Sequence, residues 1–232
     1  MSGHNKWSTI KHKKAAVDAK RGKVFTKVIK EITVAARMGG ADMNSNPRLR
    51  AAILAAKAAN MPKDTMERAV KKGTGDVDGV EYIETTYEGY GPGGVAVFVE
   101  VMTDNKNRTV GDLRYAFSRC NGNMGMDGSV AWMFERKGQI TLHCEDKKVD
   151  EDTVMLDALD AGADDVEADG DQFYVTTGMG NLYPVREALE AKGYVIGDAG
   201  LVRIAGTEVP CDAALTTQVV RLIEMLEDND DV

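Results

Sequence analysis

The chain has 232 residues, of which 43% are hydrophobic and 28% charged, a balance typical of globular proteins that excludes a fibrous or wholly disordered chain. No apolar run reaches the roughly 18–20 residues of a membrane-spanning helix, and the first residues lack the apolar core of a secretion signal. The formal net charge of −8, taken alone, argues against a nucleic-acid partner.

Three helices are expected in the first 75 residues. Apolar residues at helical spacing predict a helix that ends at Gly39-Gly40, because glycine readily adopts the left-handed cap conformation. Asn46 is expected to cap a second helix that begins at Pro47, since proline is acceptable at the first helical position. A third helix should begin at Pro62 and end near Gly73.

The pattern then changes to short strands and helices. Strands are predicted at 81–90 and 94–103, joined by the turn Gly91–Gly94, and are followed by a helix at 107–120 and a strand at 130–136. Residues 138–205 have the order β-α-β-β-α-β of a ferredoxin-like unit. Its strands are expected at 138–145, 164–169, 172–177 and 194–204, its helices at 151–161 and 181–192, and a last helix at 212–227.

These elements predict an α+β protein with three domains. Residues 1–77 form a helical bundle, residues 78–136 with 206–232 form an acidic α+β domain, and residues 137–205 form a ferredoxin-like domain inserted into it. The three scattered cysteines Cys120, Cys144 and Cys211 contain no CxxC pair, which favours a reducing cytoplasm.

Charge is distributed very unevenly along the chain. Residues 1–72 hold 17 of the 29 Lys and Arg but only 5 of the 37 Asp and Glu, a balance of +12. The remaining residues hold 12 basic and 32 acidic side chains, a balance of −20. Such asymmetry indicates a nucleic-acid-binding part joined to an acidic part. We expect the acidic part either to compete with nucleic acid for the basic part or to contact a basic partner protein.

A stripe of cations is predicted along the first helix, opposite its apolar side. A solvated face is the alternative, but such faces usually mix both signs, and like charges at this spacing repel. We expect phosphate contacts from the stripe and from the arm before it, where Trp7 either stacks on a base or caps the small core. The predicted nucleic-acid-binding residues are Lys6, Trp7, Lys11, His12, Lys13, Lys14, Lys20, Arg21, Lys23, Lys27, Lys30 and Arg37.

A second candidate site is the segment 103–109. Asp104 or Asn105 is expected to cap the following helix, and the alternative is a recognition site built from the same donors and acceptors, namely Asp104, Asn105, Lys106, Asn107 and Arg108. No catalytic motif, metal-ligand set or phosphate loop stands out, so we expect no enzyme activity, no cofactor and no metal.

Several long motifs together resemble the YebC/PmpR family, whose relatives include the mitochondrial translational activator of cytochrome c oxidase subunit I. The resemblance spans the whole chain and rests on residues 1–14, 18–25, 60–64, 87–94 and 103–109, with Asn5 replacing an expected serine. It implies three domains, the third inserted into the second, and a cytoplasmic, non-enzymatic regulator. The absence of an Arg-rich presequence favours a bacterial member.

Two functions remain open after this resemblance. The family is described as DNA-binding transcriptional regulators, whereas other members resemble ribosome- or RNA-binding translation factors, including some that act at proline-rich stalls. The sequence offers no clear base-reading helix, which favours RNA or the ribosome on physical grounds. An enzyme acting in a cleft between the acidic domains is the least favoured reading, and no membrane partner is expected.

Overall fold

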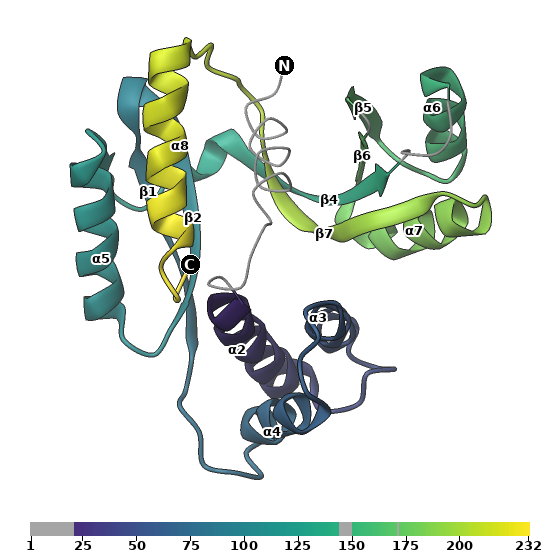
Figure 1. Cartoon of the computed structure of the whole chain (residues 1–232), viewed down its shortest axis with the longest axis horizontal. Helices are drawn as coiled ribbons and strands as arrows, with labels where there is room; N and C mark the ends of the chain where they lie inside the picture. The colour runs from purple at the N-terminus through teal and green to yellow at the C-terminus, as the bar shows by residue number, and fades with distance from the viewer. Residues whose placement is uncertain (1–20, 144–149, 171) are drawn as a thin grey trace. The chain divides into compact units, whose positions relative to one another are not determined.

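The computed structural model describes residues 21–143, 150–170 and 172–232 (Figure 1). Residues 132–208 form one compact unit, and the remaining described residues, 21–131 and 209–232, form the other. The predicted α+β class is confirmed, with helices first and then two sheets. The division into three domains stays a prediction, because contacts group the first helices with the first sheet.

The first helices of the described chain are α2 (Arg21–Gly39), α3 (Pro47–Ala58) and α4 (Lys63–Thr74). Asn46 caps α3 as predicted, since its side chain accepts a hydrogen bond from the backbone N–H of Leu49 at 3.0 Å. These helices pack around a core of Ile32, Ala35, Ala36, Leu49, Ala52, Ile53, Ala56, Met61, Met66 and Ala69. The many alanines in this core allow the helices to approach closely.

Helices α2 and α4 lie very close together at Gly73. A Cβ atom added there would collide with the carbonyl oxygen of Thr33 and the Cβ of Ala36. Only glycine therefore fits at this crossing, which explains why a residue with poor helix propensity lies inside α4.

A three-stranded sheet follows, formed by β1 (Ile83–Tyr90), β2 (Ala96–Thr103) and β3 (Asn123–Met124) in the order β2-β1-β3. The 3₁₀ turn Pro92–Gly94 joins β1 to β2, as the hairpin prediction required. The helices α5 (Lys106–Arg119) and α8 (Ala213–Glu227) pack on this sheet. Their shared core contains Val99, Val101, Leu113, Ala116, Phe117, Cys120, Leu222 and Leu226.

The buried Glu88 of β1 fixes the loop that leaves this sheet. Its carboxylate accepts hydrogen bonds from the backbone N–H groups of Gly128, Val130 and Ala131 at 2.6, 2.6 and 2.7 Å. Burial raises the pKa of Glu88, but the three N–H donors stabilise the charged form and bring its pKa below the usual value.

The second unit holds the strands β4 (Phe134–His143), β5 (Asp165–Asp169), β6 (Gln172–Thr177) and β7 (Val195–Ala205) and the helices α6 (Glu151–Asp160) and α7 (Leu182–Ala191). All neighbouring strands are antiparallel, in the order β5-β6-β4-β7. This is the order that a β-α-β-β-α-β ferredoxin-like unit adopts. Its core includes Ile140, Leu142, Val154, Phe173, Val175 and Leu189.

One predicted strand was wrong. Residues 130–136 do not form a separate strand: Ala131–Met133 make a 3₁₀ turn, and a single strand, β4, runs from Phe134 to His143. The backbone N–H groups of Val130 and Ala131 are bonded to Glu88, so they are not available for a strand ladder. No helix in the described ranges is long and apolar enough to cross a bilayer.

Candidate nucleic-acid interface

The predicted basic surface is only partly described by the structure. Lys6, Trp7, Lys11, His12, Lys13, Lys14 and Lys20 lie outside the described residues, and so does the side chain of Arg21 at the start of α2. The cations that can be placed are Lys23, Lys27, Lys30 and Arg37 of α2.

Two of these lysines contact the end of α8. Lys23 Nζ lies 2.8 Å from Asp228 Oδ1 and 3.0 Å from the Asp228 carbonyl oxygen, and Lys27 Nζ donates to the Glu227 carbonyl oxygen at 2.7 Å. The last turn of α8 has no basic residue of its own. Because a helix ends in unpaired carbonyls and a partial negative charge, the two ammonium groups stabilise that end.

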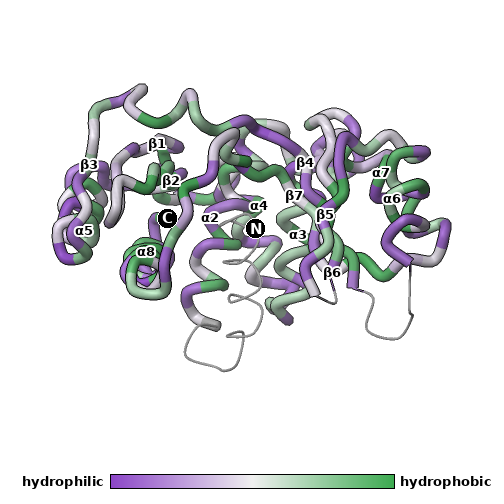
Figure 2. Tube along the Cα trace, turned by 90° about the horizontal axis from the view of Figure 1, so that it is seen from above, coloured by the Kyte–Doolittle hydropathy of each residue, from purple (hydrophilic) through white to green (hydrophobic). Residues whose placement is uncertain are grey.

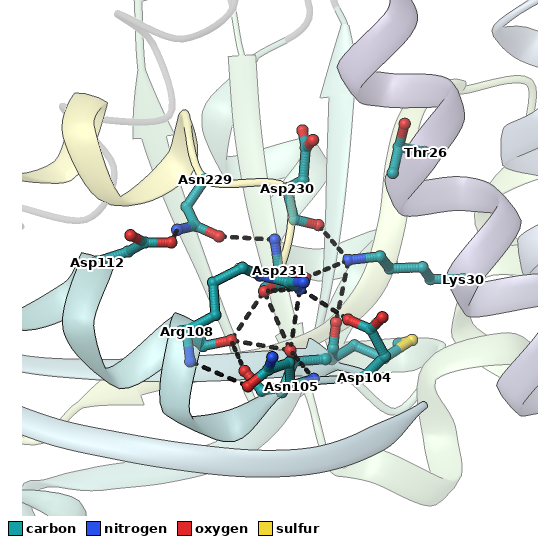
Figure 3. Close-up of polar contacts among 12 residues, drawn as sticks. Thr26, Lys30, Asp104, Asn105, Arg108, Asp112, Asn229, Asp230 and Asp231 are labelled. Carbon is teal, nitrogen blue, oxygen red and sulfur yellow. Dashed lines mark hydrogen bonds and ion pairs between the residues drawn. The ribbon is translucent and has the colours of Figure 1, made fainter. Parts of the chain in front are cut away.

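Lys30 is enclosed by the segment that follows α8. Its ammonium group lies 2.5 Å from Asp231 Oδ1, 2.8 Å from the Asp230 carbonyl oxygen and 3.2 Å from the Met102 carbonyl oxygen (Figure 3). It also lies 5.5 Å from the centre of the Tyr82 ring, within the range of a cation–π interaction. Lys30 is only 6% exposed, so no phosphate can reach it in this conformation.

Asp231 is bound by side chains from both ends of the β2–α5 connection. Its Oδ2 accepts hydrogen bonds from Thr103 at 3.0 Å, Thr109 at 2.8 Å and Arg108 at 2.8 Å (Figure 3). The residue is 4% exposed. Burial raises the pKa of Asp231, but the bonds from Lys30, Arg108 and Thr109 outweigh it and hold the pKa well below its usual range.

The segment 103–109 therefore has a clear structural role. Asn105 caps α5, as the capping interpretation predicted, by accepting a hydrogen bond from Arg108 N–H at 3.1 Å. Arg108 bridges Asp104 at 2.7 Å and Asp231 at 2.8 Å. Lys106 and Asn107 remain exposed at the start of α5. Recognition of an external ligand by this segment stays a prediction.

In the described part of α2, the cations of the predicted stripe pair with other segments of the chain, which neither the phosphate-binding interpretation nor the solvated-face alternative anticipated. Acidic residues some 200 positions away in sequence pair with this stripe, and Arg37 contacts Glu81 at 3.5 Å and donates to the Tyr82 carbonyl. A helical wheel cannot reveal such partners, because it contains only one helix. Whether Lys23, Lys27 or Arg37 also contacts nucleic acid stays a prediction.

The sequence analysis did not identify the exposed cations of α3 and α4 as candidate nucleic-acid-binding residues. Arg68, Lys71 and Lys72 on α4 and Lys57 on α3 are exposed and form no ion pair with another described residue. The signal was present in the sequence, since Arg68 and Lys72 share a helix face at i, i+4 spacing.

Within the described ranges, no group of three or more His, Cys, Asp or Glu side chains could hold a metal ion.

Comparison with known proteins supports one family for the whole chain. Residues 5–76 match the TACO1/YebC protein N-terminal domain, and residues 82–232 match the TACO1/YebC second and third domain. Proteins named probable transcriptional regulatory protein in Desulforapulum autotrophicum and Geobacter sulfurreducens are 58% and 59% identical over 232 residues, which is 100% of this chain and 93% of each relative.

A solved structure agrees with this assignment. The crystal structure of a conserved hypothetical protein from Aquifex aeolicus is 44% identical and superposes with a TM-score of 0.85, covering 94% of this chain and 90% of that one. The family matches, the identities and the shared fold lead to the same conclusion: the chain belongs to the TACO1/YebC family.

Proposed function

We propose that the protein is a cytoplasmic, non-enzymatic regulator of gene expression that binds nucleic acid through its first 76 residues. The observation that carries this proposal is the balance of +12 on residues 1–72 in a chain of net charge −8. A cationic part binds phosphates chiefly by releasing condensed counterions, which requires no particular base sequence. The names of the relatives, probable transcriptional regulatory proteins, support the same role.

The contact surface we propose combines two sets of cations. The first comprises the predicted arm, with Lys6, Trp7, Lys11, His12, Lys13 and Lys14, and the first cations of the predicted helix stripe, Lys20 and Arg21. The second is the open set on α3 and α4, namely Lys57, Arg68, Lys71 and Lys72. Lys23, Lys27 and Arg37 join this surface only if their contacts with other parts of the chain open. Lys30 is left out because it is buried.

Transcriptional regulation on DNA is the first candidate, and RNA or the ribosome is the second. The second is favoured by the outer side of α3, where Ala55 and Ala58 are exposed beside Lys57. Alanine side chains cannot hydrogen-bond to base edges, and sequence-specific DNA recognition relies mainly on such bonds. For the acidic parts of the chain, contact with a basic partner protein is the alternative to competition with nucleic acid for the cationic surface.

The two candidates can be separated with the full-length protein at matched salt. Co-sedimentation with ribosomes is compared with the electrophoretic shift of promoter DNA. In both assays, the triple variant with Arg68→Gln, Lys71→Gln and Lys72→Gln is compared with the control variant Arg221→Gln. Removing three phosphate contacts should lower the slope of log K against log salt by about 2 to 3. A variant that binds like the control would contradict the assignment of α4.

A further inference from the structure

The cations outside the first 76 residues are concentrated on one helix. Residues 78–131 and 209–232 contain 14 Asp and Glu but only five Lys and Arg. Four of these five, Lys106, Arg108, Arg114 and Arg119, lie on the 14 residues of α5, and only Arg221 lies elsewhere. In an otherwise acidic part of the protein, α5 therefore forms a local cationic surface.

The buried and exposed sides of α5 are clearly separated. Thr109, Leu113, Ala116 and Phe117 are buried toward the sheet and α8. The opposite side exposes Asn107, Gly111, Arg114, Tyr115, Ser118 and Arg119, which we call the α5 face. In Figure 2, hydrophilic and hydrophobic residues alternate along α5. The one acidic residue of α5, Asp112, accepts a hydrogen bond from Asn229 at 3.2 Å.

Tyr115 is the aromatic residue of the α5 face. It is 64% exposed, and the side chains of Tyr115, Arg114 and Arg119 form no hydrogen bond or ion pair with another described residue. An exposed aromatic ring between two free guanidinium groups combines a stacking surface with phosphate-binding groups. Proteins that bind single-stranded nucleic acid use this combination.

Gly111 provides an independent observation, because it precedes Tyr115 by one helical turn on the same side. A glycine inside a helix is less favourable than alanine, yet an added Cβ at Gly111 would meet no atom within 4 Å beyond the adjacent residues and the nearby backbone of its own helix. Packing within the described chain therefore does not require this glycine, in contrast to Gly73. The bare backbone leaves open space at Gly111, one helical turn before Tyr115, where a planar group from outside can approach.

We propose that the α5 face binds single-stranded nucleic acid, with an unpaired base on Tyr115 over Gly111 and phosphates on Arg114 and Arg119. This inference rests on the proposed function and deepens it by naming the strandedness of the partner. A base inside a duplex is already stacked on its neighbours, so it cannot also stack on Tyr115 without leaving the helix. The cations of α3 and α4 make no such distinction.

The test measures affinity of the full chain for a 20-nucleotide single strand, as RNA and as DNA, and for the duplex of the same sequence. Tyr115→Ala should weaken single-strand binding about tenfold or more, whereas Tyr115→Phe should keep it within about twofold, because phenylalanine still stacks. Duplex binding should change little in both variants. Arg136→Gln, which removes an exposed arginine on β4, is the matched control for Arg114→Gln and Arg119→Gln.

Gly111→Ala separates the proposed contact from a structural role. The substitution should raise the thermal midpoint by about 2 °C, because alanine favours the helix and the added methyl group meets no other atom. It should nevertheless weaken single-strand binding. A protein that is more stable but binds less well would support a ligand at this position, and unchanged affinity would count against it.

Failure of this inference is distinguishable from failure of the proposed function. If the unmodified protein binds neither single strands nor duplex, both are overturned. If it binds them, but the Tyr115 and Gly111 variants bind single strands as well as the unmodified protein does, only the α5 face is misassigned.

Discussion

The ammonium nitrogen of Lys30 lies 2.5 Å from Oδ1 of Asp231, although 201 residues separate the two in sequence. Both residues are almost completely buried. The same segment is also tied to β2, because the backbone N–H of Met102 donates to the Asp231 carbonyl oxygen at 2.7 Å. Lys30 and Asp231 thus join α2, the end of β2 and the segment after α8. We call this set of contacts the Lys30–Asp231 clamp.

Removing either charge of this clamp should destabilise the fold. Breaking a buried ion pair from one side costs about 3–5 kcal/mol, because the remaining charge stays buried without compensation. Asp231→Ala should be worse than Lys30→Ala, since Asp231 also accepts bonds from Arg108, Thr103 and Thr109. Urea unfolding at pH 7 measures both effects. The double variant should lose less than the sum of the two, and simple additivity would show that the two side chains are not coupled.

Stability at acid pH should depend on Asp231. Its folded pKa lies below the unfolded value near 3.9, so its stabilising effect is complete above about pH 5 and is lost as the pH falls toward the folded pKa. Asp231→Asn removes this titration. The difference in free energy of unfolding between the unmodified protein and Asp231→Asn should therefore be large at pH 7 and shrink at pH 3. A difference that is constant with pH would contradict a charged, buried Asp231.

Substitution of Glu88 should also lower stability, because its carboxylate accepts hydrogen bonds from three backbone N–H groups. Glu88→Gln keeps the shape but removes the charge, and the amide NH₂ of glutamine faces donors instead of accepting from them. We expect a loss of about 1–3 kcal/mol in the free energy of unfolding, because buried donors lose their partner. Exchange of the Val130 and Ala131 amide hydrogens should become faster in the same variant. Unchanged protection would show that the loop is held by other contacts.

Local signals explain why most elements could be predicted from the sequence. The cap formed by Asn46 and the turn at residues 91–94 depend on residues fewer than five positions apart, and both are confirmed. The ferredoxin-like order of residues 134–205 follows from the succession of strands and helices alone. The run from Val130 to Phe134 looked like a strand because it is apolar, but its backbone is used by the distant Glu88.

The candidate site was less predictable, because its charges are paired across the chain. Residues 227–231 stand out in the sequence only by their acidic bias, yet their carboxylates and backbone carbonyls are the partners of Lys23, Lys27 and Lys30. Nothing in the spacing of either segment indicates this pairing. The cations of α4 and α5 are visible in the sequence, but only the structure separates side chains that form no ion pair with a described residue, such as Arg68 and Arg114, from paired ones such as Arg108.

The two glycines inside helices α4 and α5 should respond oppositely to alanine. At Gly73 the added methyl group collides with α2, so Gly73→Ala should destabilise the protein by about 1–3 kcal/mol, as overpacking does. At Gly111 the methyl group meets no other atom, so the same change should stabilise by about 0.5–1 kcal/mol. Thermal unfolding of the two variants side by side provides the comparison. A destabilised Gly111→Ala protein would mean that this helix position has a structural requirement of its own.

Substitution of Lys27 should lower stability without changing nucleic-acid binding. Substitution of Lys71 and Lys72 should weaken nucleic-acid binding with little change in stability. Lys27→Met keeps the aliphatic stem but removes the ammonium group from the Glu227 carbonyl, so stability should fall by about 1 kcal/mol while the salt dependence of nucleic-acid binding stays unchanged. Lys71→Met with Lys72→Met removes exposed charges, so stability should change by less than about 0.5 kcal/mol while the slope of log K against log salt falls by about 2. Urea unfolding and salt titrations of the same preparations measure both quantities. If Lys27→Met instead lowers the slope by about one without destabilising the protein, the lysine stripe of α2 contacts phosphate after all.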